Sequence, residues 1–513
     1  MKNLFKKTLL VGFIGFISRT LGLVRDILIA TVFGAGLQSD AFFVSFKGFD
    51  VLRKLYSEGV LSSSFIPVFA RYEKSGGREK ALEMANSAFF AVSVISVLIM
   101  AAGMVFAPLV VRIIAPGFDP ASYSFSLSVL LFRVMMPYTV FIALTGVCMG
   151  VLNSAGSFSA PAFAPVVLNL CIILFTMMFA DKFDPPVLAV ASGVSAGGLL
   201  QLGLQIQSIR RSGNFFRTGI RIFHPGAAAA GKRLFPAIIG ASACHINMII
   251  AVFLGSCLYQ GGISYLYYAD RLVQFPVALI SASFSIVFLP ALSRKAVPGG
   301  ISDAGELLSS AARLVLFFTI PAAAGLAALR IPLVDLLYHH GAFDTRAAVN
   351  TSECLLFLVV GAWAFAGTRL FVNIFYAFSD MKIPFRAGVL SILIHIALSL
   401  LMLNSLGYKG LALSVSISGT VNFLVLLIAA CSFAQVDLKK ICFSACRAIP
   451  ASVIMYFSVS IIADYLFDAK AVAVREIMLL AGSVFAGILI YLAVQAVLKS
   501  PEIHLLKHMI RKT

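Results

Sequence analysis

The sequence has little charge, because only 12% of its 513 residues are Asp, Glu, Lys or Arg, whereas 60% are hydrophobic. Soluble domains typically carry about 25% charged residues, so this chain has too few to cover a water-exposed surface. The stretches between its apolar runs are too short to hold a large soluble domain. Together with a mean hydropathy of +0.98, this composition indicates an all-α polytopic membrane protein.

The spacings typical of metal and redox sites are also missing. Eight cysteines lie mostly inside apolar runs, and Cys442 and Cys446 are four residues apart, which is the spacing of helical neighbours. Residues 226–232 match the spacing of a phosphate-binding P-loop, but Arg233 stands where a Mg²⁺-binding Ser or Thr is needed. The sequence therefore predicts no cofactor and no metal, and we expect a protein that is not an enzyme, with no catalytic residues.

Acidic residues are few: 22 Asp and Glu stand against 40 Lys and Arg, which gives a formal net charge of +18. The basic residues fall mainly in alternate connections between apolar runs, as the positive-inside rule describes. This pattern predicts that both termini are cytoplasmic. It does not form a basic stripe interleaved with aromatic residues, so we expect no nucleic-acid partner.

About fourteen apolar runs have the length of roughly 20 residues that a bilayer-spanning helix needs. They lie near residues 8–33, 38–62, 84–111, 124–150, 160–180, 187–208, 233–257, 266–292, 308–330, 352–378, 386–404, 409–431, 446–464 and 475–498. Although residues 1–7 and the run after them resemble a signal peptide, the run is too long and too charged for one. We interpret it as a retained first helix.

The two halves of the chain repeat one another. SSFIPVFAR at 63–71 recurs as IVFLPALSR at 286–294, with Phe, Pro and Arg at matching places. Because six spans is an even number, the second copy inserts in the same orientation as the first, which is the parallel repeat found in some transporters. We expect a six-helix N-lobe at 1–208, a basic cytoplasmic linker at 209–232, a six-helix C-lobe at 233–431, and two added helices with a cytoplasmic tail at 432–513.

Ionisable residues concentrate in the first, second and eighth apolar runs, although Arg or Asp at the centre of a spanning helix costs about 2.5–3.5 kcal/mol on insertion scales. In SRTLGLVRD at 18–26, Arg19 and Asp26 share one helix face. Cations and anions in these runs nearly cancel, so one interpretation is a set of structural ion pairs. The other is a site for a diphosphate, since arginine binds such groups with a planar, bidentate fork. The residues concerned are Arg19, Arg25, Asp26, Asp40, Lys47, Asp50, Arg53, Lys54, Glu58, Asp270 and Arg271.

Three motifs, SRTLGLVRD followed by SDAF, LRKLYSEGVLSSSFIPVF and YYADRLVQFP, closely resemble the MurJ (MviN) family of bacterial lipid II flippases. This family lies in the multidrug, oligosaccharidyl-lipid and polysaccharide exporter superfamily. The resemblance implies fourteen helices, a central cationic cavity, and alternating-access transport of lipid II from the cytoplasmic to the periplasmic leaflet for cell-wall synthesis. It implies substrate binding by Arg19, Arg25, Arg53, Arg271, Asp40 and Asp270. From their positions in the same charged runs we add Asp26, Lys47 and Glu58 as supporting residues. Gln274 stands where the family often has an acidic residue.

The expected partners are thus lipid II and membrane lipids, in the bacterial cytoplasmic (inner) membrane, with the coupling ion left open. Two alternatives belong to the same superfamily: a flippase for another lipid-linked oligosaccharide, and a multidrug or cation antiporter. The arginines argue against the antiporter, because they would repel a cationic drug.

The loop charges generate a topology prediction. A cysteine at Gln38 or Asp468 should react with a membrane-impermeant reagent added from the periplasmic side, and one at Ser75 or Ser302 should not. Labelling of whole cells and of lysed cells, compared by mass, measures this difference. Periplasmic labelling at Ser75 would show that the chain inserts in the opposite orientation.

Overall fold

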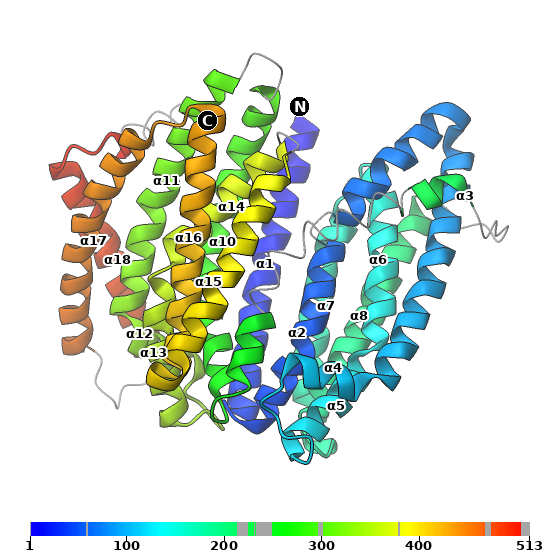
Figure 1. Ribbon diagram of the computed structural model, residues 1–513, viewed down its shortest axis with the longest axis horizontal. Helices are drawn as coiled ribbons and strands as arrows, with labels where there is room; N and C mark the ends of the chain where they lie inside the picture. Colours follow the sequence, from blue (N-terminus) through cyan, green and yellow to red (C-terminus); the bar gives the residue numbers. More distant parts are fainter. Residues whose placement is uncertain are drawn as a thin grey trace. The chain divides into compact units, whose positions relative to one another are not determined.

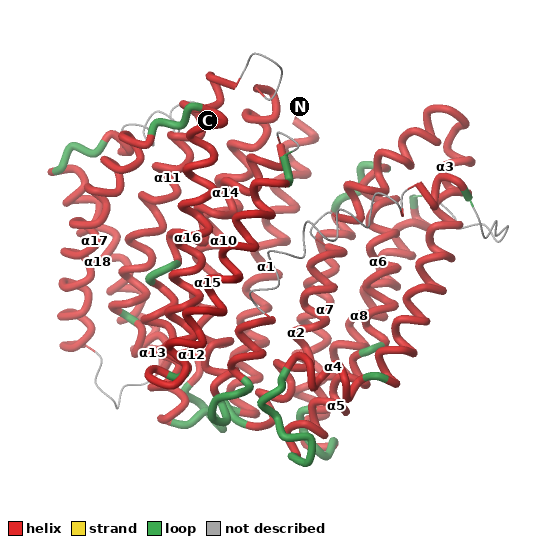
Figure 2. The backbone as a smooth tube through the Cα atoms, viewed as in Figure 1, coloured by secondary structure: helices red, strands yellow, loops and turns green. Residues whose placement is uncertain are grey.

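The computed structural model is built from α-helices, and along the part of the chain that it describes no strand occurs (Figures 1 and 2). It describes the backbone of residues 2–57, 60–212, 224–229, 231, 249–295, 301–377, 380–466 and 473–503. The chain divides into two compact units, residues 1–264 and 265–513. This division does not test the lobe and linker boundaries expected from the sequence, and they stay a prediction.

The first unit contains eight of the labelled α-helices among its described residues. They are α1 (Lys2–Phe33), α2 (Leu37–Ser57), α3 (Val60–Val105), α4 (Ala107–Ile114), α5 (Tyr123–Met135), α6 (Pro137–Ser154), α7 (Ser159–Phe179) and α8 (Leu188–Arg211). The helix α7 packs along both α1 and α8, α3 packs along α6, and α2 packs along α5. The helices α1 and α2, which carry the described candidate residues of this unit, are linked through α7, α8 and α5, because α5 also packs along α8.

The core of the first unit lies between α3, α6 and α8. Phe65 and Met84 of α3 are buried there against Val147 and Val151 of α6. The helix α3 continues through the basic segment 71–80, which the sequence analysis assigned to a connection between spans. Gly77, with φ of 75°, interrupts it, because glycine adopts this left-handed conformation without the steric cost that a side chain brings.

Along its described residues, the second unit contains eight further labelled helices, preceded by α10 (Gly262–Lys295), which begins in the last residues of the first unit. They are α11 (Ile301–Ala328), α12 (Arg330–Tyr338), α13 (Thr345–Val359), α14 (Ala362–Ala377), α15 (Lys382–Leu406), α16 (Tyr408–Ala434), α17 (Leu438–Leu466) and α18 (Ala473–Val497). The helices α13 and α14 form a single apolar segment that is bent by 51°. The added helices α17 and α18 pack on each other, and α17 packs along α11.

The internal repeat is visible in the order and the starting points of the helices. The short helices α4 and α12 begin at Ala107 and Arg330, which are as far apart in the sequence as the two copies of the repeated motif. The helices α7 and α15 begin at Ser159 and Lys382, again at the same separation. Two copies of the same helical plan thus follow one another along the chain, as the motif spacing predicted.

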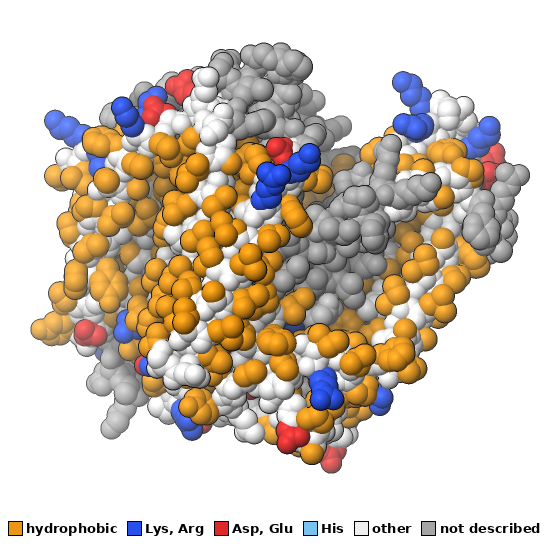
Figure 3. All heavy atoms as spheres, in the orientation of Figure 1, with side chains coloured by type: hydrophobic (Ala, Val, Ile, Leu, Met, Phe, Trp, Pro, Cys, Tyr) orange, Lys and Arg blue, Asp and Glu red, His pale blue; other side chains and the backbone are white. Residues whose placement is uncertain are grey.

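Nine described helices are long and apolar enough to cross a membrane, or ten spans if the bent pair counts as one. The exact number of fourteen stays a prediction. The helix α1 has the necessary length, but Arg19, Arg25 and Asp26 lie within it. Figure 3 shows hydrophobic side chains along the sides of α15 and α16, where Leu401 is 75% exposed and Ile428 is 62% exposed. Such surfaces are stable when they face lipid tails.

An ion pair anchors the residues that follow α18. Glu502, whose side chain is 1% exposed, accepts hydrogen bonds from Arg313 Nε at 2.8 Å and from Ser500 Oγ at 2.5 Å. Burial alone would raise the pKa of Glu502, but the hydrogen bonds from Ser500 and Arg313 outweigh it, so the pKa lies below its usual value. The folded state therefore favours the charged carboxylate.

This pair generates a stability prediction. Because the pKa of Glu502 is lower in the folded chain, its contribution to stability is present above the unfolded value of about 4.3 and is lost as the pH falls through the folded value. Glu502→Gln should lower the free energy of unfolding by about 3 kcal/mol at pH 7, since it leaves a largely buried guanidinium without its carboxylate. Thermal unfolding in detergent from pH 7 down to pH 3 should show the difference from wild type shrinking.

The matched control is Glu73→Gln, because Glu73 pairs with Arg78 on the surface at 3.6 Å, where both side chains are more than a third exposed. That variant should cost less than about 1 kcal/mol. Equal effects of the two variants would contradict a stabilising role for the buried pair.

Candidate functional site

Arg25 lies at the centre of the first cluster of predicted site residues. Its side chain projects from α1 and is buried, with 6% of the residue exposed. Its Nε and Nη2 atoms donate to Asp26 Oδ1 at 3.0 and 2.7 Å, and its Nη1 donates to Asn169 Oδ1 of α7 at 3.1 Å. A buried guanidinium is tolerable only when it is paired and hydrogen-bonded. These contacts supply both conditions.

The guanidinium of Arg25 also lies beside α2, 5.9 Å from the ring centre of Phe46, a distance at which a cation and an aromatic face attract. Two further predicted cations of the first unit, Lys47 and Arg19, have described side chains. Lys47 follows Phe46 in α2 and is buried. Arg19 is exposed on α1, so the structure separates it from Asp26, with which it shares a face in an ideal helix.

Asp40 lies near the start of α2 and is buried, at 3% exposure. Its carboxylate accepts hydrogen bonds from Gly261 N at 2.6 Å, from Ser264 N at 2.9 Å and from Ser264 Oγ at 2.6 Å. The first amides of a helix have no partner within the helix, and the helix dipole favours negative charge there. Asp40 therefore caps the start of α10 from another helix, an arrangement that the sequence did not indicate.

The predicted pair Asp270 and Arg271 lies on α10 within the second unit. Arg271 donates to the hydroxyl of Tyr267 from Nη2 at 2.8 Å, and its guanidinium lies 5.0 Å from the centre of the same ring. Gln274 Nε2 donates to Asp270 Oδ1 at 3.2 Å, and Gln274 Oε1 accepts from Arg369 of α14. The glutamine thus links a carboxylate to a second arginine.

The remaining predicted site residues are Arg53 and Glu58. The backbone of Arg53 belongs to α2, but its side chain lies outside the described residues, as does the whole of Glu58. Arg25, Asp26, Asp40 and Lys47 lie together in the first unit, and Asp270 and Arg271 lie in the second.

The sequence analysis did not identify three residues that belong to the site, Asn169, Tyr267 and Arg369. Each of them contacts a predicted residue, or its neighbour Gln274, directly. Asn169 stands alone in the apolar run VVLNLCIILF, and a single amide in such a run signals a partner inside the membrane. That signal was available in the sequence, whereas the contact of Arg369 with Gln274 depends on the packing of helices far apart along the chain.

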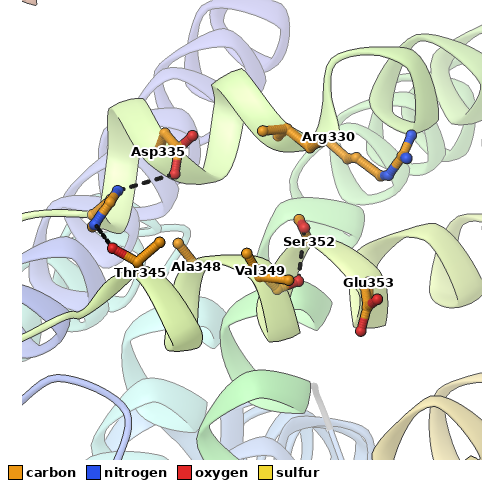
Figure 4. Close-up of a pocket in the computed structure, with 9 residues that line it drawn as sticks. Arg330, Asp335, Thr345, Ala348, Val349, Ser352 and Glu353 are labelled. Atoms are coloured by element: carbon orange, nitrogen blue, oxygen red, sulfur yellow. Dashed lines mark hydrogen bonds and ion pairs between the residues drawn. The ribbon is translucent and has the colours of Figure 1, made fainter. Parts of the chain in front are cut away.

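A pocket of about 260 Å³ lies in the second unit between α12 and α13, and none of the predicted site residues lines it (Figure 4). Arg330 and Asp335 lie on the α12 side and Glu353 on the α13 side. His339 Nδ1 lies 3.2 Å from Asp335 Oδ1. Among the described residues, no three His, Cys, Asp or Glu side chains are grouped so that they could hold a metal ion.

The family described as lipid II flippase MurJ matches residues 29–457. A protein of Buchnera aphidicola subsp. Acyrthosiphon pisum, named a probable lipid II flippase MurJ, is 34% identical over 424 residues, 83% of each chain. The lipid II flippase MurJ of Burkholderia cenocepacia is 32% identical over 434 residues, also 83% of each chain. The similarity therefore extends through both units.

The fold of the chain is also similar to that of solved structures. A lipid II flippase MurJ in an inward closed conformation matches with a TM-score of 0.81 and 28% identity, covering 96% of this chain and 98% of the other. An inward-facing multidrug transporter of the MATE family matches with a TM-score of 0.68 and 14% identity, which shows a shared fold alone. Because the family match spans most of the sequence and the two named relatives share about a third of their residues with it over most of their length, the chain belongs to the lipid II flippase MurJ family.

Proposed function

We propose that this protein flips lipid II from the cytoplasmic to the periplasmic leaflet of the bacterial inner membrane, for cell-wall synthesis. The observation that carries the proposal is the buried, hydrogen-bonded guanidinium of Arg25 inside a helix bundle of this family. The lipid crosses intact, so no covalent bond is broken and the protein needs no catalytic residue. The coupling ion is left open.

The chemistry of the substrate supports this choice of residues. Lipid II carries a diphosphate, and a guanidinium binds such a group through parallel N–H donors more strongly than an ammonium does. Arg25 and Arg271 each present a guanidinium whose plane is held by protein contacts. We assign both to the diphosphate, with Arg53 as the third member of the set. A cation antiporter would place carboxylates, rather than arginines, at the substrate.

We further propose that transport proceeds by alternating access, with Asp40 acting as a gate contact. Asp40 joins the start of α2 to the start of α10 through three hydrogen bonds. Gln38 and Asp40 lie near the start of α2, which is its predicted periplasmic end. For the outer side to open, the two helix ends must separate, and the bonds to Asp40 are contacts that must break. The carboxylate then stabilises the outward-closed state instead of contacting the lipid.

The gate proposal predicts an effect on transport without a matching effect on binding. Asp40→Ala should abolish transport, Asp40→Asn should retain part of it because the amide oxygen still accepts hydrogen bonds, and Ser264→Ala should be mildest because two amide donors remain. Lipid II affinity, measured in detergent, should stay within about threefold of the wild-type value. The reason is that Asp40 is proposed not to contact the lipid, so its replacement removes no binding interaction. A large loss of affinity in Asp40→Asn would place the carboxylate in the substrate site instead.

The diphosphate assignment predicts a loss of binding. Arg25→Ala, Arg53→Ala and Arg271→Ala should each weaken lipid II affinity by about tenfold or more, since a charge-assisted hydrogen bond contributes about 1.5–3 kcal/mol. Replacement by Lys keeps the charge but not the fork, so it should restore affinity only in part. Rescue of a strain depleted of its own flippase, and labelled lipid II reaching the outer leaflet, measure the function.

The matched control for these variants is Arg112→Ala, because Arg112 is exposed on α4. It should bind and transport like the wild type. If all three site variants kept full affinity and full rescue at normal membrane levels, the arginines would be structural ion pairs, and the diphosphate proposal would be wrong.

A further inference from the structure

Asn169 is a buried amide in an otherwise apolar stretch of α7. The residue is 8% exposed, and its neighbours along the chain are Leu168 and Leu170. Burying an amide without hydrogen bonds is unfavourable, because the group loses its bonds to water and gains none. An amide at this place is therefore kept for what it bonds to.

Both ends of the Asn169 side chain are used, and both contacts go to α1. Its Oδ1 accepts from Arg25 Nη1 at 3.1 Å, and its Nδ2 donates to the carbonyl oxygen of Ser18 at 3.0 Å. Ser18 and Arg25 are seven residues apart, so they share one face of α1. Gly22 lies on the same face, where a β-carbon would come within 3.6 Å of Nδ2. The amide thus links two residues of α1 that lie two helical turns apart.

Asp26 and Asn169 hold different parts of the Arg25 guanidinium. Asp26 holds Nε and Nη2, and Asn169 holds Nη1. Bonds to both sides of a planar group prevent it from rotating about its long axis. A fork that is held in plane loses less conformational freedom when an anion binds, which favours affinity.

The neutrality of Asn169 matters as much as its geometry. Asp26 already contributes one negative charge at 2.7 Å from Arg25. A second carboxylate at position 169 would hold Arg25 more strongly, but the three side chains together would then carry a net negative charge. Such a group repels an anion. An amide orients the guanidinium and leaves the three side chains with no net charge, so it adds no repulsion toward an anion.

We propose that Asn169 is a positioning residue of the substrate site, which orients Arg25 for the diphosphate of the transported lipid. The proposal rests on the function proposed above, because it takes Arg25 to be the diphosphate ligand. It adds a residue on α7 that acts through Arg25 and does not contact the lipid itself. It also explains why the amide, rather than a carboxylate, occupies this position.

The test compares Asn169→Leu, which removes both bonds, with Asn169→Asp, which keeps an acceptor for Arg25 and adds charge. Lipid II in detergent is the probe, and its affinity and the thermal transition of each variant are measured. Asn169→Leu should weaken affinity about tenfold. Asn169→Asp should weaken it at least as much while keeping a native-like transition. Asp also lacks the donor that Asn169 offers to the Ser18 carbonyl, so a residue that merely ties α1 to α7 would show a lowered thermal transition in both variants, with the lipid II affinity of the folded protein unchanged.

A double-mutant cycle separates positioning from structural support. In an Arg25→Ala background, Asn169→Leu should change affinity no further, because the group that Asn169 orients is absent, whereas Asn169→Asp still repels the anion through its charge. The control is Thr176→Val, a change in the same helix. It removes a buried hydroxyl that donates to the backbone carbonyl of Ile172 in that helix. It should bind lipid II like the wild type.

The outcomes distinguish failure of this inference from failure of the proposed function. Wild-type affinity in both Asn169 variants, or an equal loss from Asn169→Leu with and without Arg25, would overturn the positioning role. If Asn169→Leu does not fold, Asn169→Ala, which also removes both bonds, takes its place in the cycle with Arg25→Ala. Unchanged affinity in Arg25→Ala by itself would contradict the diphosphate assignment, whatever the Asn169 variants do.

Discussion

The high cost of placing charge among apolar helices is the constraint on which the first unit depends. Arg25 is buried in α1, and it is tolerated there because Asp26 neutralises it and Asn169 satisfies a further donor. Each of these contacts requires a definite rotation of its helix. With Phe46 beside the same guanidinium, one cation constrains how α1, α2 and α7 pack. A polar cluster of this kind specifies a unique packing more strictly than interchangeable apolar side chains do.

Much of the fold could be predicted because apolar runs and internal repeats are local or periodic features of the sequence. The separation between the two copies of the repeated motif recurs in the starts of α4 and α12. Details that depend on single backbone angles escaped this reasoning. Gly77 interrupts α3 by its φ of 75°, and the sequence marked its surroundings as a connection, but it did not show that helix continues on both sides of this glycine. The 51° bend between α13 and α14 depends likewise on tertiary packing.

The candidate site divides in the same way. Which charged residues matter could be predicted, since a charge in an apolar run is conspicuous wherever it falls. Their partners could not, because helical periodicity places residues on faces but does not say which helix lies opposite. Periodicity put Arg19 with Asp26, whereas Asp26 is bonded to Arg25, its neighbour in the chain. The contact from Asp40 to Ser264 spans 224 residues, a distance over which no sequence pattern carries information about pairing.

The ion pair between Arg313 and Glu502 has a consequence for biosynthesis. Glu502 follows Arg313 by 189 residues, so the ribosome delivers the arginine long before its carboxylate exists. While α11 enters the bilayer, its guanidinium must be accommodated by water or by lipid headgroups at the interface. Only after α17 and α18 have been inserted can the pair form. A chain that ends before Glu502 therefore retains a helix with a largely buried, unneutralised guanidinium.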